Sequence, residues 1–526
     1  MVAKINSAQI VGLKTDIVDV EVDINRGLQS FNIVGLPDKA VAEAKDRINS
    51  AIKNSGFKAP QKGNKKVIVS LAPANLRKEG STFDLAIALG YLLAAGEIKF
   101  DPKQKLFIGE LALDGSLRSI AGALLIAQKA KEKGFAEIYL PADNATEAAL
   151  IRDITIYPCQ TLKQITNHLS PKIEEGDDGD RYSIRTRTIS PAPETKIEIK
   201  DESAGWRNAS DFAEIRGQQT AKRGLEIAAA GGHNVAMYGP PGTGKTMLAR
   251  AFTAIMPPLS IDEIIEVTGI HSASGVLSEE LITHPPFRSP HHTSSYVSLV
   301  GGGAWPKPGE ITMAHRGVLF LDEFPEFDKK VIESLRQPLE DKVISVARAR
   351  SSINFPASFI LVAALNPCPC GFKGSRVKEC TCTQSQIQKY SRKVSGPIID
   401  RIDIWLDVPQ INHEDLSGNK PSGEPSQKIR ERVLAARAHQ TKRFYDIKNI
   451  NNNGEMGVKE IKKYAPLTDS SSKLLNDSAK RLNLSARAYH RVIKLARTIA
   501  DLANSPNIKD EHLLEALQYR PKNIFE

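Results

Sequence analysis

The feature that most constrains this chain is a glycine-rich segment that fits the pattern G-x-x-x-x-G-K-[ST] at every position. It reads Gly239-Pro240-Pro241-Gly242-Thr243-Gly244-Lys245-Thr246. An apolar, strand-like run over 234–238 precedes it, and a helix-compatible run over 247–252 follows. In this context, backbone amides of the loop converge on nucleotide phosphates. The sequence therefore predicts an ATP site, with Lys245 facing the β- and γ-phosphates and the Thr246 hydroxyl helping to hold Mg²⁺.

Two further strands end in polar residues that suit ATP hydrolysis. The apolar run over 318–321 ends in Asp322 and Glu323, and the run over 359–365 ends in Asn366. We expect Asp322 to orient Mg²⁺ through its water shell, Glu323 to polarise the attacking water, and Asn366 to position that water. The alternative is a solvated acidic turn and a plain Asn-Pro turn. Three buried strands with polar ends favour the functional interpretation.

Length and composition bound the remaining possibilities. The chain has 526 residues, of which 41% are hydrophobic and 25% charged, so wholesale disorder is excluded and about three domains are expected. The net charge of +10 suits nucleic acid binding but equally suits a slightly basic enzyme. No apolar run reaches the roughly 18 residues that a membrane span needs, and the N-terminus does not have the pattern of a secretory signal. We therefore expect a cytoplasmic protein without a membrane partner.

Changes in composition along the chain predict four parts. These are an α/β block over 1–170, an acidic and proline-containing linker over 171–205, a second α/β block over 206–415 and a helical region over 426–526. Hydrophobic spacing also predicts individual elements of the first block. They are helices over 39–54, 83–95 and 121–133, and strands over 18–24, 66–71, 105–108 and 137–140.

Four of the five cysteines form a compact pattern of two C-x-C pairs separated by nine residues. They are Cys368, Cys370, Cys380 and Cys382. Four thiolates bind Zn²⁺ tetrahedrally and leave no open position for catalysis, so we predict a structural zinc site. Free reduced thiols are the alternative, because C-x-C is less typical of zinc sites than C-x-x-C.

With these motifs in place, the chain resembles an AAA+ ATPase, in which Asn366 corresponds to the residue called sensor 1. The segment over 395–403 resembles the one that carries the arginine finger, here Arg401, and the segment over 484–487 resembles sensor 2, here Arg487. Arg491 competes for the sensor 2 role, and a surface salt bridge is the alternative for each lone arginine. A finger supplied by a neighbouring subunit implies a ring.

Two inserts narrow the resemblance. One contains His291-His292 and the glycines over 301–303, and the other, over 337–355, is expected to form a β-hairpin carrying Arg348 and Arg350 near its tip. They resemble the inserts of magnesium-chelatase ATPase subunits and MCM helicases, which project into a central channel. In that setting, Arg348 and Arg350 would contact DNA phosphates without reading sequence.

The whole chain is similar to the ComM/YifB family, often called magnesium-chelatase-like. The markers are the segment over 31–37, the His291-His292 segment and the segment over 366–371. The resemblance implies a homohexameric, ATP-dependent DNA helicase that drives branch migration in recombination or natural transformation. It also implies an N-terminal domain with a ribosomal S5/Lon-protease-like α/β fold, an AAA+ core with channel-facing inserts, and a C-terminal helical lid.

Two other functions remain open. The Lon-like fold suggests an ATP-dependent protease with Ser81 as nucleophile, but the segment over 120–125, where a partner lysine is expected, contains none. We therefore interpret the N-terminal domain as a DNA- or partner-binding module. The other alternative is a chelatase-type motor that remodels a protein partner, which we do not expect to carry this N-terminal domain.

A basic loop in the first block offers further phosphate contacts, or is simply solvated. Its lysines are Lys58, Lys62, Lys65 and Lys66.

Overall fold

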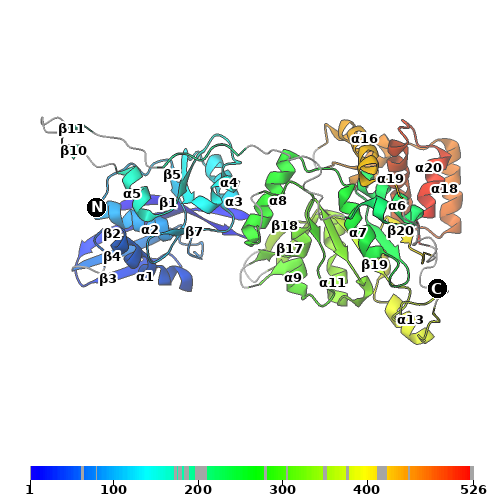
Figure 1. Ribbon diagram of the computed structural model, residues 1–526, viewed down its shortest axis with the longest axis horizontal. Helices are drawn as coiled ribbons and strands as arrows, with labels where there is room; N and C mark the ends of the chain where they lie inside the picture. Colours follow the sequence, from blue (N-terminus) through cyan, green and yellow to red (C-terminus); the bar gives the residue numbers. More distant parts are fainter. Residues whose placement is uncertain are drawn as a thin grey trace. The chain divides into compact units, whose positions relative to one another are not determined.

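The chain folds into two compact units in the computed structural model. One comprises Met1–Glu198 with Ile264–Ile282, and the other comprises Ile199–Glu263 with Thr283–Glu526. We describe each unit by itself (Figure 1). The residues that the structure describes are 2–60, 64–78, 80–170, 174–175, 181–182, 189–195, 210–277, 281–303, 306–347, 352–374, 378–411, 423–447 and 450–521.

The first unit is built on a seven-stranded mixed sheet in the order β3-β4-β2-β1-β5-β8-β9. Strands β1, β2 and β4 pair antiparallel, while β3 joins β4 and β5 joins β1 in parallel. Helix α2 is apolar on nearly all faces and is buried against β1 and β2, as expected for a helix without a solvent side. The strands are β1 Ala3–Val11, β2 Lys14–Arg26, β3 Ser30–Val34, β4 Lys65–Ala72, β5 Lys105–Phe107, β8 Glu137–Pro141 and β9 Thr155–Cys159.

Helices complete the first unit, together with a short ribbon of β6 (Glu110–Leu111) and β7 (Leu117–Arg118). The end of helix α8 (Ile261–Ser274) also belongs here, because the Ser272 hydroxyl accepts a hydrogen bond from the Gly122 amide at 3.0 Å. The remaining helices are α1 Lys39–Asn54, α2 Asp84–Ala94, α3 Ala123–Glu132, α4 Ala145–Ala148 and α5 Leu162–Leu169. The three helices and four strands predicted for this block are confirmed, with small shifts at their ends.

The second unit contains a five-stranded parallel sheet in the order β13-β16-β19-β12-β20. Every residue of β16 and β19 is buried, which explains their continuous apolar sequences. Because all the strands run the same way, the segments that follow them emerge at one edge of the sheet. The strands are β12 Val235–Tyr238, β13 Phe287–Arg288, β16 Val318–Leu321, β19 Ile360–Leu365 and β20 Ile404–Asp407.

Helices cover this sheet, and two small ribbons extend the unit. The ribbons pair β14 (Gly301–Gly302) with β15 (Lys307–Pro308), and β17 (Val343–Ala347) with β18 (Ser352–Pro356). The second ribbon is the predicted hairpin, although the residues before it form helix α12 instead. The helices before residue 400 are α6 Gln219–Gly231, α7 Lys245–Ala254, α9 Tyr296–Val300, α10 Glu310–Met313, α11 Lys329–Ser334, α12 Arg336–Asp341, α13 Gln384–Ser391 and α14 Gly396–Ile399.

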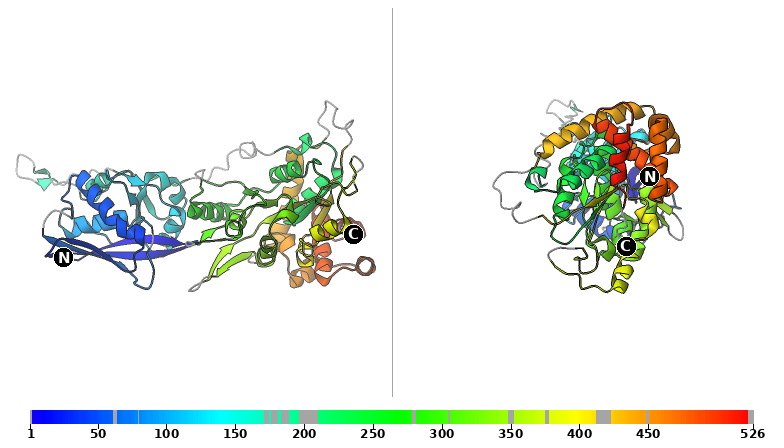
Figure 2. Two further views of the ribbon diagram at one scale, coloured as in Figure 1. Left: turned by 90° about the horizontal axis from the view of Figure 1, so that it is seen from below. Right: turned by 90° about the vertical axis from the view of Figure 1, so that its right-hand side faces the viewer.

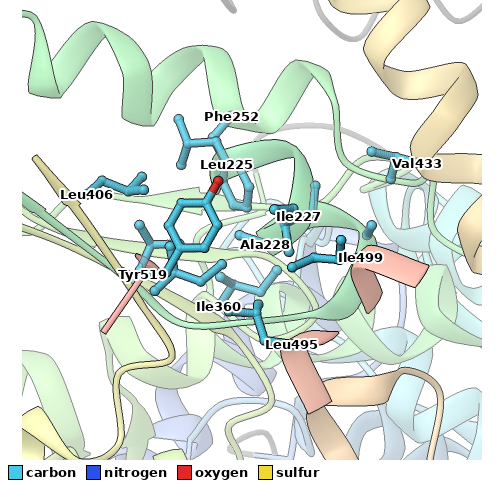
Figure 3. Close-up of a cluster of buried hydrophobic side chains, with 14 of the residues drawn as sticks. Leu225, Ile227, Ala228, Phe252, Ile360, Leu406, Val433, Leu495, Ile499 and Tyr519 are labelled. Atoms are coloured by element: carbon cyan, nitrogen blue, oxygen red, sulfur yellow. The ribbon is translucent and has the colours of Figure 1, made fainter. Parts of the chain in front are cut away.

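The C-terminal region is helical, as predicted, and shares one hydrophobic core with the sheet. Figure 3 shows Leu225 and Phe252 from α6 and α7 beside Leu406 of β20, with Val433 and Ile499 from the C-terminal helices. The orange and red helices lie beside the green sheet elements in both views of Figure 2. They are α16 Ser426–Phe444, α17 Val458–Tyr464, α18 Asp469–Arg481, α19 Ala486–Leu502 and α20 Asp510–Gln518.

Two predictions from the sequence concern the linker and membrane-spanning segments. Most of the predicted linker over 171–205 lies outside the described residues. Among the helices in the described ranges, none has the length and apolar character needed to cross a bilayer.

Candidate active site

The glycine-rich loop joins β12 to α7 and wraps around the Lys245 side chain. Gly244 adopts a φ of 90°, a left-handed conformation that favours glycine and lets α7 begin at Lys245. The Lys245 ammonium donates to the carbonyls of Gly239 (2.7 Å) and Pro240 (2.8 Å). Burial lowers the pKa of Lys245 to about 8, against the opposing effect of nearby carboxylates. A bound triphosphate would add negative charge at this ammonium and favour its protonated form.

The two predicted Mg²⁺ ligands contact one another. The Thr246 hydroxyl on α7 donates to the Asp322 carboxylate, which follows β16, at 2.9 Å. Hydroxyl and carboxylate oxygens are the ligands that Mg²⁺ prefers, and it usually keeps several waters as well. These two residues therefore fit a magnesium ion held directly by Thr246 and, through its water shell, by Asp322.

Glu323 and Asn366 lie at the same edge of the sheet. Asn366 follows β19, and its side-chain oxygen accepts a hydrogen bond from the Lys245 ammonium at 3.1 Å. Glu323 follows Asp322 in a left-handed conformation (φ 50°), and its side chain is 51% exposed. An exposed carboxylate beside a phosphate loop can accept a proton from water. The structure thus gathers five predicted residues at one edge of the sheet: Lys245, Thr246, Asp322, Glu323 and Asn366.

The two predicted functional arginines lie elsewhere. Arg401 precedes β20, and its carbonyl accepts a hydrogen bond from the Asn234 side chain, just before β12. Arg401 therefore lies at the amino-terminal edge of the parallel sheet, opposite the edge that carries Lys245. The Arg401 guanidinium forms an ion pair with one carboxylate oxygen of Glu340 at 2.7 Å. The Arg487 guanidinium pairs with the other oxygen of Glu340 at 2.9 Å.

Arg491, the competitor for the sensor 2 role, has a different partner. Its guanidinium pairs with Asp403, which is buried at the start of β20. Burial alone would raise the pKa of Asp403, but Arg491 and His233 beside it hold that pKa at about 2. Arg491 therefore balances a buried charge between the sheet and α19, whereas the Arg487 side chain remains 59% exposed.

Sequence reasoning missed two contacts of this unit. Glu340 carried no signal, because a single acidic residue in a mixed polar segment is common. His292 was part of a marker segment but had no assigned role, and its Nδ1 lies 3.4 Å from the Glu323 carboxylate. A signal for that contact exists in the topology, because the segment after β13 must emerge beside the end of its parallel neighbour β16.

The four clustered cysteines come together as predicted. Their sulfur atoms all lie within 4.8 Å of one another. Tetrahedral Zn–S bonds of about 2.3 Å place sulfur atoms about 3.8 Å apart. The separations of Cys368 from Cys370 (3.3 Å) and from Cys380 (3.6 Å) are close to that spacing. The amide of Lys373 also donates to the Cys368 sulfur, and the amide of Cys370 donates to the Cys382 sulfur, as at thiolate metal sites.

The cysteine cluster lies against the phosphate loop. Gly371 follows Cys370 with a φ of 83°, and a Cβ placed on it would come within 2.6 Å of the Pro241 ring. This close approach requires glycine, and it joins the cluster to the loop that surrounds Lys245.

The remaining predictions from the sequence concern the hairpin arginines and the first unit. Arg348 and Arg350 lie outside the described residues, as does Lys62. In the first unit, the Ser81 hydroxyl contacts the Glu110 carboxylate, and the buried Lys78 ammonium donates to the Pro73 carbonyl. A serine paired with a carboxylate in this way is not arranged as a Ser-Lys dyad.

Comparisons with known proteins show which families the chain matches. It matches the family described as "Magnesium chelatase, subunit ChlI" over residues 211–416, its C-terminal counterpart over 423–520, and "Subunit ChlI of Mg-chelatase" over 20–144. The last match removes our argument that a chelatase-type motor would not carry this N-terminal domain, because a family of that description covers it.

The ComM and YifB proteins match this chain along nearly its whole length. The chain is 42% identical to the competence protein ComM of Haemophilus influenzae, over 98% of this chain and 97% of that protein. It is 39% identical to YifB of Escherichia coli, over 98% and 96% of the two chains. The magnesium-chelatase 67 kDa subunit of Heliobacterium mobile is 27% identical over only 32% of this chain and 29% of its own length. This chain therefore belongs to the ComM/YifB family of magnesium-chelatase-like AAA+ proteins.

Proposed function

We propose that this protein is a homohexameric, ATP-driven DNA motor with helicase or branch-migration activity in recombination or natural transformation. The observation that carries the proposal is the separation of its functional groups. Lys245, Asp322 and Glu323 lie at the carboxyl edge of the parallel sheet, and Arg401 lies at the amino edge. A subunit cannot bring both edges to one phosphate, but a closed ring joins two different surfaces of identical subunits at every interface and so can bring one edge to the other.

The chemistry follows from the contacts at the carboxyl edge. ATP phosphates would bind the loop amides and the Lys245 ammonium, and Mg²⁺ would be held by Thr246 and, through its water shell, by Asp322. Glu323 takes a proton from the attacking water, which Asn366 positions. Arg401 of the neighbouring subunit stabilises the charge that develops on the transferred phosphoryl group, with Arg487 beside it.

DNA is the favoured substrate because similarity to the competence protein ComM extends over 98% of this chain, whereas the magnesium-chelatase 67 kDa subunit of Heliobacterium mobile matches only 32% of it. The charge of +10 suits a polyanion. The hairpin of β17 and β18 would present Arg348 and Arg350 to the DNA backbone in the central channel.

The test is to measure ATP hydrolysis with single-stranded, duplex and branched DNA, with a protoporphyrin system and with unfolded protein. Stimulation by DNA, together with migration of a branched junction, is the expected result. Stimulation only by the protoporphyrin system would favour the chelatase-type motor. Stimulation by unfolded protein, with its cleavage, would favour the protease.

We predict that the hairpin arginines contact phosphates. Replacing Arg348 and Arg350 with Ala should flatten the slope of log DNA affinity against log salt by up to about two units per engaged subunit, because fewer counterions are released. Junction migration should fall more than basal ATP hydrolysis. Binding titrations at several salt concentrations measure the slope. Lys65→Ala with Lys66→Ala is the matched control, and a slope that changes only in that control would move the DNA contact to the first unit.

The cysteine cluster adds a structural Zn²⁺ to the proposal. The four sulfur atoms have the spacing of a tetrahedral site, and backbone amides already point at two of them. The ion would fix the loop between Asn366 and α13, and through Gly371 the position of the phosphate loop.

We predict one zinc per subunit in protein purified without chelator. Cys380→Ser should lose the metal, because three thiolates hold zinc less tightly than four. Cys159→Ser is the control, since Cys159 is buried in β9 of the first unit and should leave the metal content unchanged. Metal analysis decides the matter, and substoichiometric zinc in well-folded wild-type protein would favour free thiols.

A further inference from the structure

The short helix α12 is hydrogen-bonded to the hairpin of β17 and β18. The Gln337 side chain on this helix donates to the Ser345 hydroxyl at 3.1 Å, and its oxygen accepts from the Ser345 backbone amide at 3.3 Å. The Ser345 hydroxyl donates in turn to the side-chain oxygen of Asn354, its register partner on β18, at 2.9 Å. Both strands of the hairpin are therefore tied to α12.

The same helix contacts the residues that precede β20. The Arg336 guanidinium donates to the Ser395 hydroxyl at 3.3 Å, and the Glu340 carboxylate pairs with Arg401 at 2.7 Å. Gln337 and Glu340 are three residues apart, so they lie on one side of the helix. One helical turn therefore joins the hairpin to the guanidinium of Arg401.

These polar contacts lie on the solvent side of the hairpin. Gln337, Ser345 and Asn354 are all exposed. Ile344, which precedes Ser345, is only 2% exposed and packs in the hydrophobic core. Water can replace the hydrogen bonds of exposed groups, so apolar packing, rather than these contacts, holds the base of the hairpin in place. A role in transmitting movement explains the contacts better than a role in folding.

We propose that α12 couples the hairpin of one subunit to the arginine finger of the same subunit, and so to the ATP bound by its neighbour. Gln337 and Glu340 are the positioning residues of this coupling. The inference rests on the proposed function, in which DNA binds the hairpin and Arg401 acts across the interface. A helix of six residues moves as one body, because its backbone hydrogen bonds fix its shape. A shift of the hairpin at Gln337 therefore moves the Glu340 carboxylate and the guanidinium that it holds.

The coupling has a direction that can be tested. Strand β18 leads to β19 and Asn366, so the hairpin has a second route, to the ATP of its own subunit. The route through α12 reaches the ATP of the neighbour instead. The two routes differ in which subunit must carry an intact Gln337 for DNA to stimulate a given ATP site.

The experiment uses rings mixed from two inactive proteins, Lys245→Ala and Arg401→Ala. Each active interface in such a ring joins the finger of a Lys245→Ala subunit to the phosphate loop of an Arg401→Ala subunit. Gln337→Ala is added to one protein at a time, and ATP hydrolysis is measured with and without branched DNA. In the Lys245→Ala protein, it should abolish stimulation by DNA and leave the DNA-free rate unchanged. In the Arg401→Ala protein, it should leave both rates unchanged.

Gln388→Ala replaces an exposed glutamine of α13 and is the matched control, which should keep the stimulation in either protein. Equal loss in both placements of Gln337→Ala would indicate a structural role or weaker DNA binding. Loss only in the Arg401→Ala protein would indicate the route through Asn366. Either result, or no loss at all, overturns the coupling alone. A parent mixture that recovers no activity, or none that DNA raises, overturns the proposed function and the coupling with it.

Discussion

Replacing Glu323 with Gln should leave ATP binding intact and lower kcat by about 10²- to 10⁴-fold, the usual contribution of a general base. The amide keeps the size of the side chain and its exposed position after β16 but cannot take a proton from water. The measurement is nucleotide affinity together with steady-state turnover. Glu326→Gln is the matched control, because Glu326 is an exposed carboxylate in the same turn that pairs with Lys393.

The contrasting variant is Lys245→Ala, which should lose ATP binding rather than hydrolysis alone. The ammonium is the charge that the loop holds in place for the phosphates. Full-length protein that folds but does not bind ATP is the expected outcome. Wild-type turnover in Glu323→Gln would show that the carboxylate does not activate water, and ATP binding by Lys245→Ala would remove the loop assignment.

Arg401→Ala should bind ATP and yet show almost no turnover. The ATP bound by each neighbouring subunit would lack the guanidinium that stabilises the transferred phosphoryl group. A finger supplied within a GTPase or by a partner changes kcat by about 10³- to 10⁵-fold, so a large loss is expected. Lys245→Ala should also be inactive. An equal mixture of the two should recover activity, since about one quarter of the interfaces in a random ring join an intact loop to an intact finger.

The mixture provides its own folding control, because recovery requires both variants to fold and to assemble. Arg481→Ala, an exposed arginine of α18, should give no recovery beyond its own activity when mixed with either inactive variant. Failure of the equal mixture in rings shown to be mixed would mean that Arg401 does not act across the interface.

The residues at the carboxyl edge were predictable because local sequence carries their position. Asp322, Glu323 and Asn366 follow apolar runs, and Lys245 and Thr246 follow another through the glycine-rich loop. In a parallel sheet the segments that follow the strands meet at one edge, whatever the order of the strands. Thr246 and Asp322 are in contact for this reason, although they are far apart in the chain. The helix over 39–54 was likewise predictable, since its apolar residues repeat with helical spacing and Asp38 caps its start.

The amino edge was less predictable, because its contacts depend on side chains brought together by the tertiary fold. The sequence marked Arg401 and Arg487 only by resemblance and gave no indication that one carboxylate would bridge them. Glu340 lies on α12, Arg401 precedes β20 and Arg487 is on α19, so no local pattern relates the three. The same holds for Asp403, whose partner Arg491 comes from the C-terminal helices.

The Glu340 carboxylate offsets part of the positive charge of Arg401 and Arg487 within a single subunit. Arg401 is only 6% exposed while it contacts Glu340, so its guanidinium is covered within a single subunit. If Arg401 acts across the interface, ring closure must exchange this internal carboxylate for a phosphate of the ATP that a neighbour binds. Nucleotide and neighbour would then be required together, and activity per subunit would rise steeply with protein concentration instead of staying constant.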